Sequence, residues 1–167
     1  MSLSMYAITV PVFTRYLNNL DAFLATAAAN AAERKIKPEV LAAARLAPDM
    51  HPLTFQVQSS TDRVKFALAR LTGRTPPSWE DNEVTLGDLR GRVKKALDYV
   101  ATFSEADLAG TEDKSVTLKV RGEDTQVPAV EHITLSAVPQ IFFHITAAYA
   151  ILRHNGVPLG KRDFTGA

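Results

Sequence analysis

The fold is decided by residues 139–156, which read PQIFFHITAAYAILRHNG. This stretch is apolar nearly all round a helix, and Gly156 follows a last turn that holds Arg153 and His154, as is typical of a helix end. A helix without a polar face belongs in the centre of a bundle. The exception in this apolar stretch is His144. A buried imidazole costs about 1–3 kcal/mol unless it forms a hydrogen bond, binds a metal or takes part in proton transfer.

Three other amphipathic helices precede this one, each marked by apolar residues at the i, i+3, i+4 and i+7 spacing. We expect them at residues 12–32, 52–72 and 86–103, with a short helix at residues 38–46 and the apolar helix at residues 131–155. Pro11 begins or kinks the first helix, and Thr85 caps the third. Pro139 should bend the last helix and free the carbonyl of Leu135.

Two short runs between the last two helices have the two-residue period of β-strands. SVTLKV and TQVPAV flank RGED, which predicts a hairpin with a four-residue turn. Because an isolated two-stranded hairpin is barely stable, we expect it to lie against the helices. The chain is therefore predicted to be mainly α, a four-helix bundle with a short helix after helix one and a small β-hairpin before helix four.

Composition limits the class of protein. A chain of 167 residues with 46% hydrophobic content can build one well-buried core, so residues 1–167 should form a single domain. Its 19 basic and 18 acidic residues are interspersed, which argues against a nucleic-acid partner or an anionic membrane. There is no cysteine, no secretion signal and no run of about 20 apolar residues that would span a membrane. We expect a soluble, cytoplasmic protein.

The candidate chemistry centres on His144 and on Gln140, which lies one turn before it on the same helix face. A histidine pair at this spacing would converge on one metal ion, but a glutamine amide is a poor ligand for zinc or nickel. His144 therefore has two interpretations. It is hydrogen-bonded in the core to Gln56, Gln58 or a backbone carbonyl. Alternatively, it binds a metal together with His51, just before helix two, and a third group from Asp49, Gln56 or Gln58.

Two further features lie outside this polar set. His132 is about 120° round an ideal helix from His144 and should not join it. Phe55 and Phe66 give helix two a second apolar face, which another helix or a second copy of the chain in a homodimer would cover.

Three segments resemble a known family: SMYAITVPVF (residues 4–13), LAPDMHPLTFQVQ (46–58) and FFHITAAYAILRHNGVPLGKRDF (142–164). They are similar to those of a bacterial family of unknown function that is classed with the DinB and YfiT-like helical bundles. The resemblance extends over essentially the whole chain, and it implies the same bundle fold.

The resemblance also implies where a metal site would lie. In the metal-binding DinB-like proteins, one histidine from helix two and an HxxxH pair from helix four hold a divalent ion, often nickel or zinc. The second histidine of the pair corresponds to His144, the first to Gln140, and the helix-two ligand falls near Gln56 or Gln58. Since one ligand of three is a histidine here, we expect a degenerate metal site.

Three functions follow as hypotheses. The first is binding of a small molecule in an interhelical pocket. Four polar side chains would line this pocket and two would lie near its mouth: His144, Gln140, Gln56 and Gln58, then Asp49 and His51. The second is a divalent-metal-dependent hydrolase or thiol transferase, in which His144 and His51 bind zinc or nickel. The third is a structural homodimer.

Overall fold

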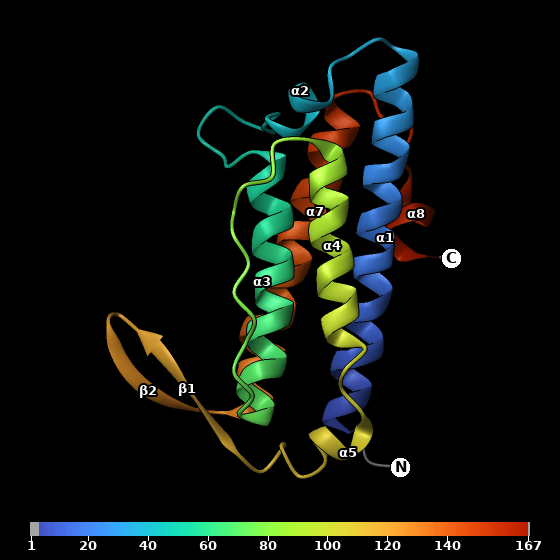
Figure 1. Cartoon of the computed structure of the whole chain (residues 1–167). Coiled ribbons are helices and arrows are strands. Elements are labelled where there is room, and N and C mark those ends of the chain that lie inside the picture. Colours follow the sequence, from blue (N-terminus) through green and yellow to red (C-terminus); the bar gives the residue numbers. More distant parts are fainter. Residues whose placement is uncertain (1–3, 167) are drawn as a thin grey trace.

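Four long helices run alongside one another in the computed structural model, which describes residues 4–166 (Figure 1). They are α1 (Met5–Glu33), α3 (Leu53–Thr72), α4 (Leu86–Val100) and α7 (Val138–His154). The shorter elements are α2 (Pro38–Ala42), α5 (Glu105–Leu108), β1 (Ser115–Val120), β2 (Glu123–Pro128), α6 (Ala129–Glu131), the π-helical segment η1 (His132–Ala137) and α8 (Lys161–Thr165). The predicted mainly α four-helix bundle, with a short helix after the first long helix and a hairpin before the last, is confirmed.

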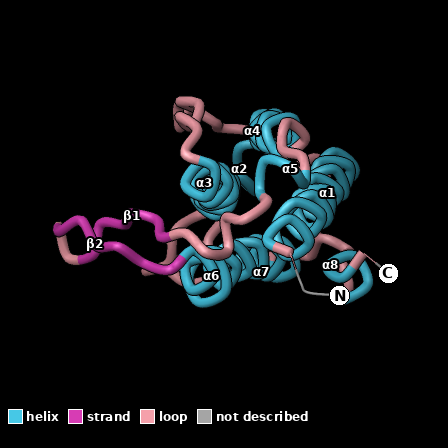
Figure 2. The backbone as a smooth tube through the Cα atoms, turned by 90° about the horizontal axis from the view of Figure 1, so that it is seen from below, coloured by secondary structure: helices cyan, strands magenta, loops and turns pink. Residues whose placement is uncertain are grey.

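The core fills the space between the long helices. The apolar stripe on α3 is buried there, at Leu53, Val57, Val64, Leu68 and Leu71. Seen from below, α7 lies beside both α3 and α1, and α4 closes the opposite side (Figure 2). Helix α7 therefore has an inner side within the bundle and an outer side that no long helix covers.

Helix α1 begins earlier than its apolar pattern predicts. It starts at Met5, because the Ser4 hydroxyl accepts a hydrogen bond of 3.2 Å from the backbone N–H of Ala7 and so caps the first turn. Pro11 consequently lies inside the helix, on its exposed side. Two other helices end earlier than predicted: α2 stops at Ala42 instead of continuing to residue 46, and α4 stops at Val100 instead of continuing to Phe103.

Pro139 produces a π-helical turn instead of the predicted bend. The backbone is helical without a break from Ala129 to His154, but the N–H of Val138 bonds to the carbonyl of Ile133, five residues back. A proline ring clashes with the carbonyl four residues before it, and a wider turn moves those carbonyls away from the ring. The segment η1 therefore lets α6 and α7 continue as one long helix.

The hairpin differs from the prediction in its turn and in its position. Val120 pairs with Glu123, so the turn contains two residues, Arg121 and Gly122, with φ angles of 53° and 90°. Positive φ at both positions matches the type I′ turn that suits the twist of a hairpin. The strands project away from the bundle (Figures 1 and 2), and Val116 at their base is buried in the core. The expectation that the hairpin lies against the helices is therefore wrong along most of its length.

One segment has the length and composition of a membrane span. Residues 129–154 form a helical stretch of 26 residues with a hydropathy of 1.5, although the sequence contains no run of about 20 purely apolar residues. In the bundle, 44% of its most apolar window is buried. Because the central helix of a globular protein passes the same test, this segment is weak evidence for a membrane span.

Candidate functional site

A cleft of about 460 Å³ lies between the C-terminal half of α3, the η1–α7 segment and the hairpin. Side chains from three walls line it: Arg63, Phe66 and Arg70 from α3; Thr117, Leu118, Lys119, Val120 and Asp124 from the hairpin; His132, Ser136, Ala137 and Gln140 from η1 and α7. The cleft thus combines apolar, basic and neutral polar groups. We call it the hairpin cleft.

The positive charges of the hairpin cleft are only partly balanced. Lys119 pairs with Asp124 across the strands at 2.9 Å, whereas neither Arg63 nor Arg70 forms an ion pair within residues 4–166. The Nε atom of Arg63 is buried and has no hydrogen-bond partner there. Burial lowers the pKa of both arginines, and the charge of Arg63 lowers that of Arg70 further, but both groups stay protonated at neutral pH.

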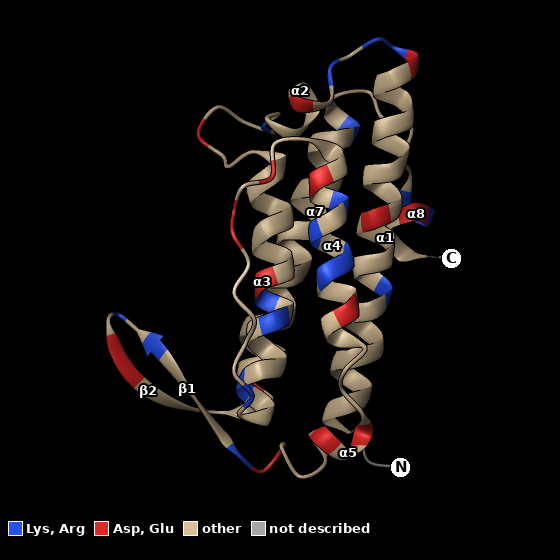
Figure 3. Ribbon diagram, viewed as in Figure 1, with Lys and Arg blue, Asp and Glu red and all other residues tan. Residues whose placement is uncertain are grey.

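The wall opposite α3 carries no charge at all. From residue 132 to residue 152 the sequence contains no Asp, Glu, Lys or Arg. Basic side chains do lie on the lower half of α3, near the point where the hairpin leaves the bundle (Figure 3). The two arginines therefore face neutral polar groups across the cleft.

His132 is the least satisfied polar group in this wall. It is 4% exposed, and within the described residues neither of its ring nitrogens has a hydrogen-bond partner. Burial lowers the pKa of His132 from its ordinary value of 6.5, and the nearby charge of Arg70 lowers it further. The ring is therefore neutral at pH 7, with one donor and one acceptor to offer.

Ideal helix spacing did not predict His132 as a site residue, because the segment between it and His144 is partly π-helical. An ideal α-helix turns by about 100° per residue, which separates His132 from His144 by about 120°. A π-helical residue turns by only about 80°, so about six such residues reduce that separation to roughly 10°. Both histidines consequently face α3, and the signal was the proline at position 139, whose effect was expected to be a bend.

His144 lies farther along the same helix and is hydrogen-bonded. Its Nδ1 atom lies 2.8 Å from Oε1 of Gln56, whose amide nitrogen donates to the carbonyl of His51 at 3.0 Å. Because the Gln56 oxygen can only accept, His144 donates through Nδ1. The residue is 8% exposed, and burial, followed by the charges of Arg63 and His51, lowers its pKa to about 4.

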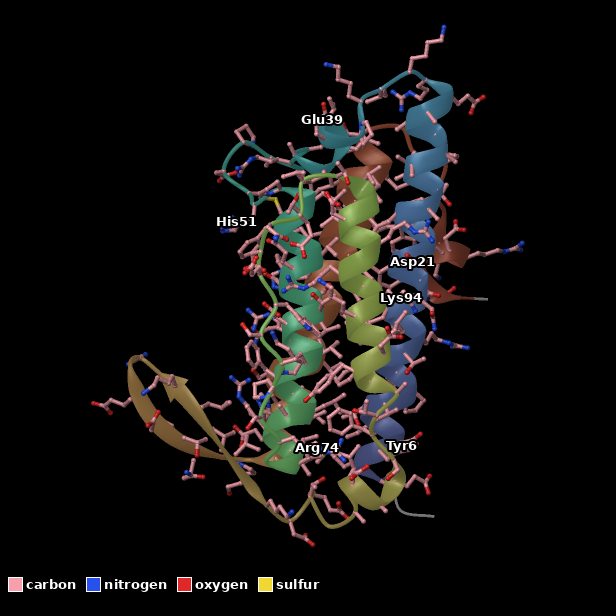
Figure 4. All side chains as sticks on the ribbon, in the orientation of Figure 1. Tyr6, Asp21, Glu39, His51, Arg74 and Lys94 are labelled. Carbon is pink, nitrogen blue, oxygen red and sulfur yellow. The ribbon has the colours of Figure 1, made fainter. Side chains whose placement is uncertain are left out.

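The other predicted site residues are divided between several places. Gln140 lines the hairpin cleft and donates a hydrogen bond of 2.8 Å to the Ser136 hydroxyl. Gln58 instead bonds to Glu83 at 2.8 Å. Asp49 is exposed, and His51 lies exposed at the N-terminal end of α3, far from the hairpin (Figure 4). The mouth expected at Asp49 and His51 would lie at the N-terminal end of α3. The hairpin cleft lies instead beside the C-terminal half of that helix.

The residues at the DinB metal positions do not fit a metal ion. Gln56 and His144 are bonded to each other, and Gln140 directs its amide group to Ser136. The ring of His51 stacks on Phe55 at 3.9 Å between centroids. Within residues 4–166, no three His, Asp or Glu side chains gather closely enough to hold a metal. These side chains are arranged to bond to one another and not to share an ion.

Comparison with known proteins places the chain in a family. Residues 5–165 match the family described as Domain of unknown function (DUF1993). The crystal structure of a DinB family member protein from Shewanella denitrificans resembles the chain with a TM-score of 0.91. The two sequences are 41% identical, over 98% of this chain and 92% of the other. No curated protein matches the chain. The family and the fold agree with the resemblance noted in the sequence.

Proposed function

The chain belongs to the DUF1993 family and has the fold of a DinB family member, and we propose that it binds a small organic molecule in the hairpin cleft. The cleft has the size of a ligand site, since pockets for small molecules usually measure about 300–1,000 Å³. Its walls come from segments far apart in the sequence, as is common for ligand sites in helical bundles.

The observation that carries this proposal is the state of His132. A buried polar group without a partner costs about 1–3 kcal/mol, and such groups in native proteins call for an explanation. Here both ring nitrogens are without a partner within residues 4–166, and the ring lines a cavity large enough for a ligand. A bound molecule would supply the missing hydrogen bonds if the ring turned toward the cleft, because protein atoms cover both nitrogens in the structure.

The apolar part of the hairpin cleft favours an organic ligand over a simple ion. Phe66 on α3 faces this space together with Leu118 and Val120 of the hairpin. Sites for organic molecules are mostly apolar, with a few polar groups that fix the orientation of the ligand. His132 and Gln140 would be two of those groups, and the His144–Gln56 hydrogen bond would fix α7 against α3 beside them.

A ligand-observed NMR screen of a fragment library tests this proposal. Thr117→Trp would fill the hairpin cleft, because Thr117 is an exposed strand residue on its wall. The matched control is Thr102→Trp, at an exposed position just after α4 that does not line the cleft. We expect fragments that bind the wild type and the control but not Thr117→Trp. The proposal would be refuted if the fragments bound all three proteins equally, or if no fragment bound the wild type.

We also propose a second copy of the chain as a partner, on a separate observation. Leu135 and Phe143 on the outer side of η1 and α7 are 73% and 60% exposed, and exposed apolar side chains on one side of a helix favour association. Phe66 lies in the hairpin cleft, so it is not part of this surface. Size-exclusion chromatography with light scattering tests the idea, and a monomer at micromolar concentration would refute it.

A further inference from the structure

We infer that the ligand of the hairpin cleft is an organic dianion, an apolar body that carries a phosphate group or two carboxylates and is bound by Arg63, Arg70 and His132. This inference rests on the proposed function and names its ligand class.

The charges that line the hairpin cleft indicate how many negative charges the ligand carries. The hairpin wall is neutral, because Lys119 and Asp124 pair with each other. The η1–α7 wall offers His132 as its titratable group. The α3 wall contributes two guanidinium groups that form no ion pair within residues 4–166. The charge of Asp62 acts on Arg63, but Asp62 is itself paired with Lys65 and Arg92. Both guanidinium groups are therefore left without an ion-pair partner among the described residues, and a dianion would neutralise them.

The spacing of the arginines fits a ligand with an apolar body. Arg63 and Arg70 lie seven residues apart on α3, about 10 Å along the axis and on nearly the same face. Phe66 lies between them, and the Arg70 guanidinium is 5.3 Å from the centroid of its ring. An apolar body packed on Phe66 would place its acidic groups within reach of both arginines, whose planar forks bind carboxylate and phosphate oxygens.

The opposite wall offers hydrogen-bond donors to the same anion. Neutral His132 can donate from one ring nitrogen. The Ser136 oxygen accepts a hydrogen bond from Gln140 at 2.8 Å, which leaves its own O–H free to donate elsewhere. An oxygen-rich anion accepts such bonds, whereas an uncharged apolar ligand leaves both donors unsatisfied.

Isothermal titration calorimetry at low salt tests the inference with four aromatic probes. Phenyl phosphate and phthalate are dianions, benzoate is a monoanion and benzamide is uncharged. We expect either dianion to bind at least about tenfold more tightly than benzoate, and benzamide to bind most weakly. The preferred dianion distinguishes a phosphate site from a dicarboxylate site, and either preference supports the inference.

Charge-neutralising variants test the assigned residues. Arg63→Gln and Arg70→Gln should each weaken phenyl phosphate binding by about tenfold or more. Arg15→Gln, on the exposed side of α1, removes the same charge away from the cleft and should bind as the wild type does. If Arg63→Gln fails to fold, Arg63→Lys keeps the charge but loses the planar fork, and it should also bind more weakly.

The outcomes separate this inference from the proposed function. If benzamide binds as tightly as the dianions and Thr117→Trp abolishes its binding, the cleft binds ligands but the dianion assignment is wrong. Equal losses in Arg15→Gln and Arg70→Gln would also overturn it, because they would show unspecific attraction. If no probe and no fragment binds, the proposed function fails as well.

Discussion

His144 should make the stability of the protein depend on pH in a predictable direction. Its pKa is about 4 in the folded protein and 6.5 ordinarily. At least about one pH unit above 6.5 the ring is neutral in both states, so it adds no pH dependence there. As the pH falls from 6.5 toward 4, the unfolded chain binds a proton at this position that the folded chain resists. The free energy of unfolding therefore decreases over this range.

The size of the effect follows from the difference between the two pKa values. One pKa unit corresponds to about 1.36 kcal/mol, so the full difference amounts to about 3 kcal/mol by pH 4. Between about pH 7.5 and pH 5 the expected loss is about 2 kcal/mol. With a urea dependence of about 2 kcal/mol per molar, this loss lowers the unfolding midpoint by about 1 M.

Urea unfolding followed by far-UV circular dichroism measures this contribution. The variant His144→Gln does not titrate, so it should lack about 2 kcal/mol of the loss that the wild type shows between about pH 7.5 and pH 5. His132 contributes in the same direction in both proteins and cancels in the comparison. His154→Gln, at the exposed end of α7, is the matched control and should follow the wild type. Identical pH profiles for the wild type and His144→Gln would refute the reasoning.

Four other substitutions have defined outcomes. His132→Leu removes two buried nitrogens without partners and should raise the free energy of unfolding by about 1–3 kcal/mol while it weakens phenyl phosphate binding; a loss of stability in urea unfolding would mean that His132 has a structural role. Arg92, with a side chain that is 0% exposed, bonds to Asp62 and Glu83 at 2.9 and 3.1 Å, so Arg92→Met should cost about 3–5 kcal/mol. The exposed pair of Arg90 and Asp21 is the contrast, and Arg90→Met should cost less than about 1 kcal/mol; thermal unfolding of both variants checks this order. Gly122 has a φ angle of 90°, so Gly122→Ala should distort the hairpin turn and weaken phenyl phosphate binding. The melting temperature of the bundle should stay nearly unchanged. An unchanged affinity for phenyl phosphate in calorimetry would argue that the hairpin takes no part in binding.

Periodicity was sufficient to predict the helices, because each apolar stripe is a local pattern. The stripe on α3 and the cap at Thr85 lie where the spacing predicts. Local spacing does not fix contacts between elements. It left both Gln56 and Gln58 as partners of His144, and only the packing of α7 selects Gln56 and leaves Gln58 to Glu83.

The hairpin cleft was beyond the reach of the sequence for the same reason. It needs the phase shift of the η1 segment, since Pro139 indicates a disturbance of the helix but not a π-helical turn. It also needs the direction in which the hairpin leaves the bundle, which residue types do not specify. Arg92 is a similar case. The spacing of apolar residues on α4 does not predict that the Arg92 side chain is buried. Its acidic partners lie elsewhere, on α3 and in the loop before α4.

We expect the ring nitrogens of His132, which have no partner within residues 4–166, to form hydrogen bonds with a ligand in the hairpin cleft. Long-range nitrogen–proton NMR of the histidine rings, recorded with and without saturating phenyl phosphate, tests it most directly. We predict that His132 is neutral in the free protein and that both of its ring-nitrogen signals shift on binding, while those of His144, already bonded to Gln56, stay in place. Signals of His132 that do not change, or that already show two hydrogen bonds in the free protein, would contradict the claim.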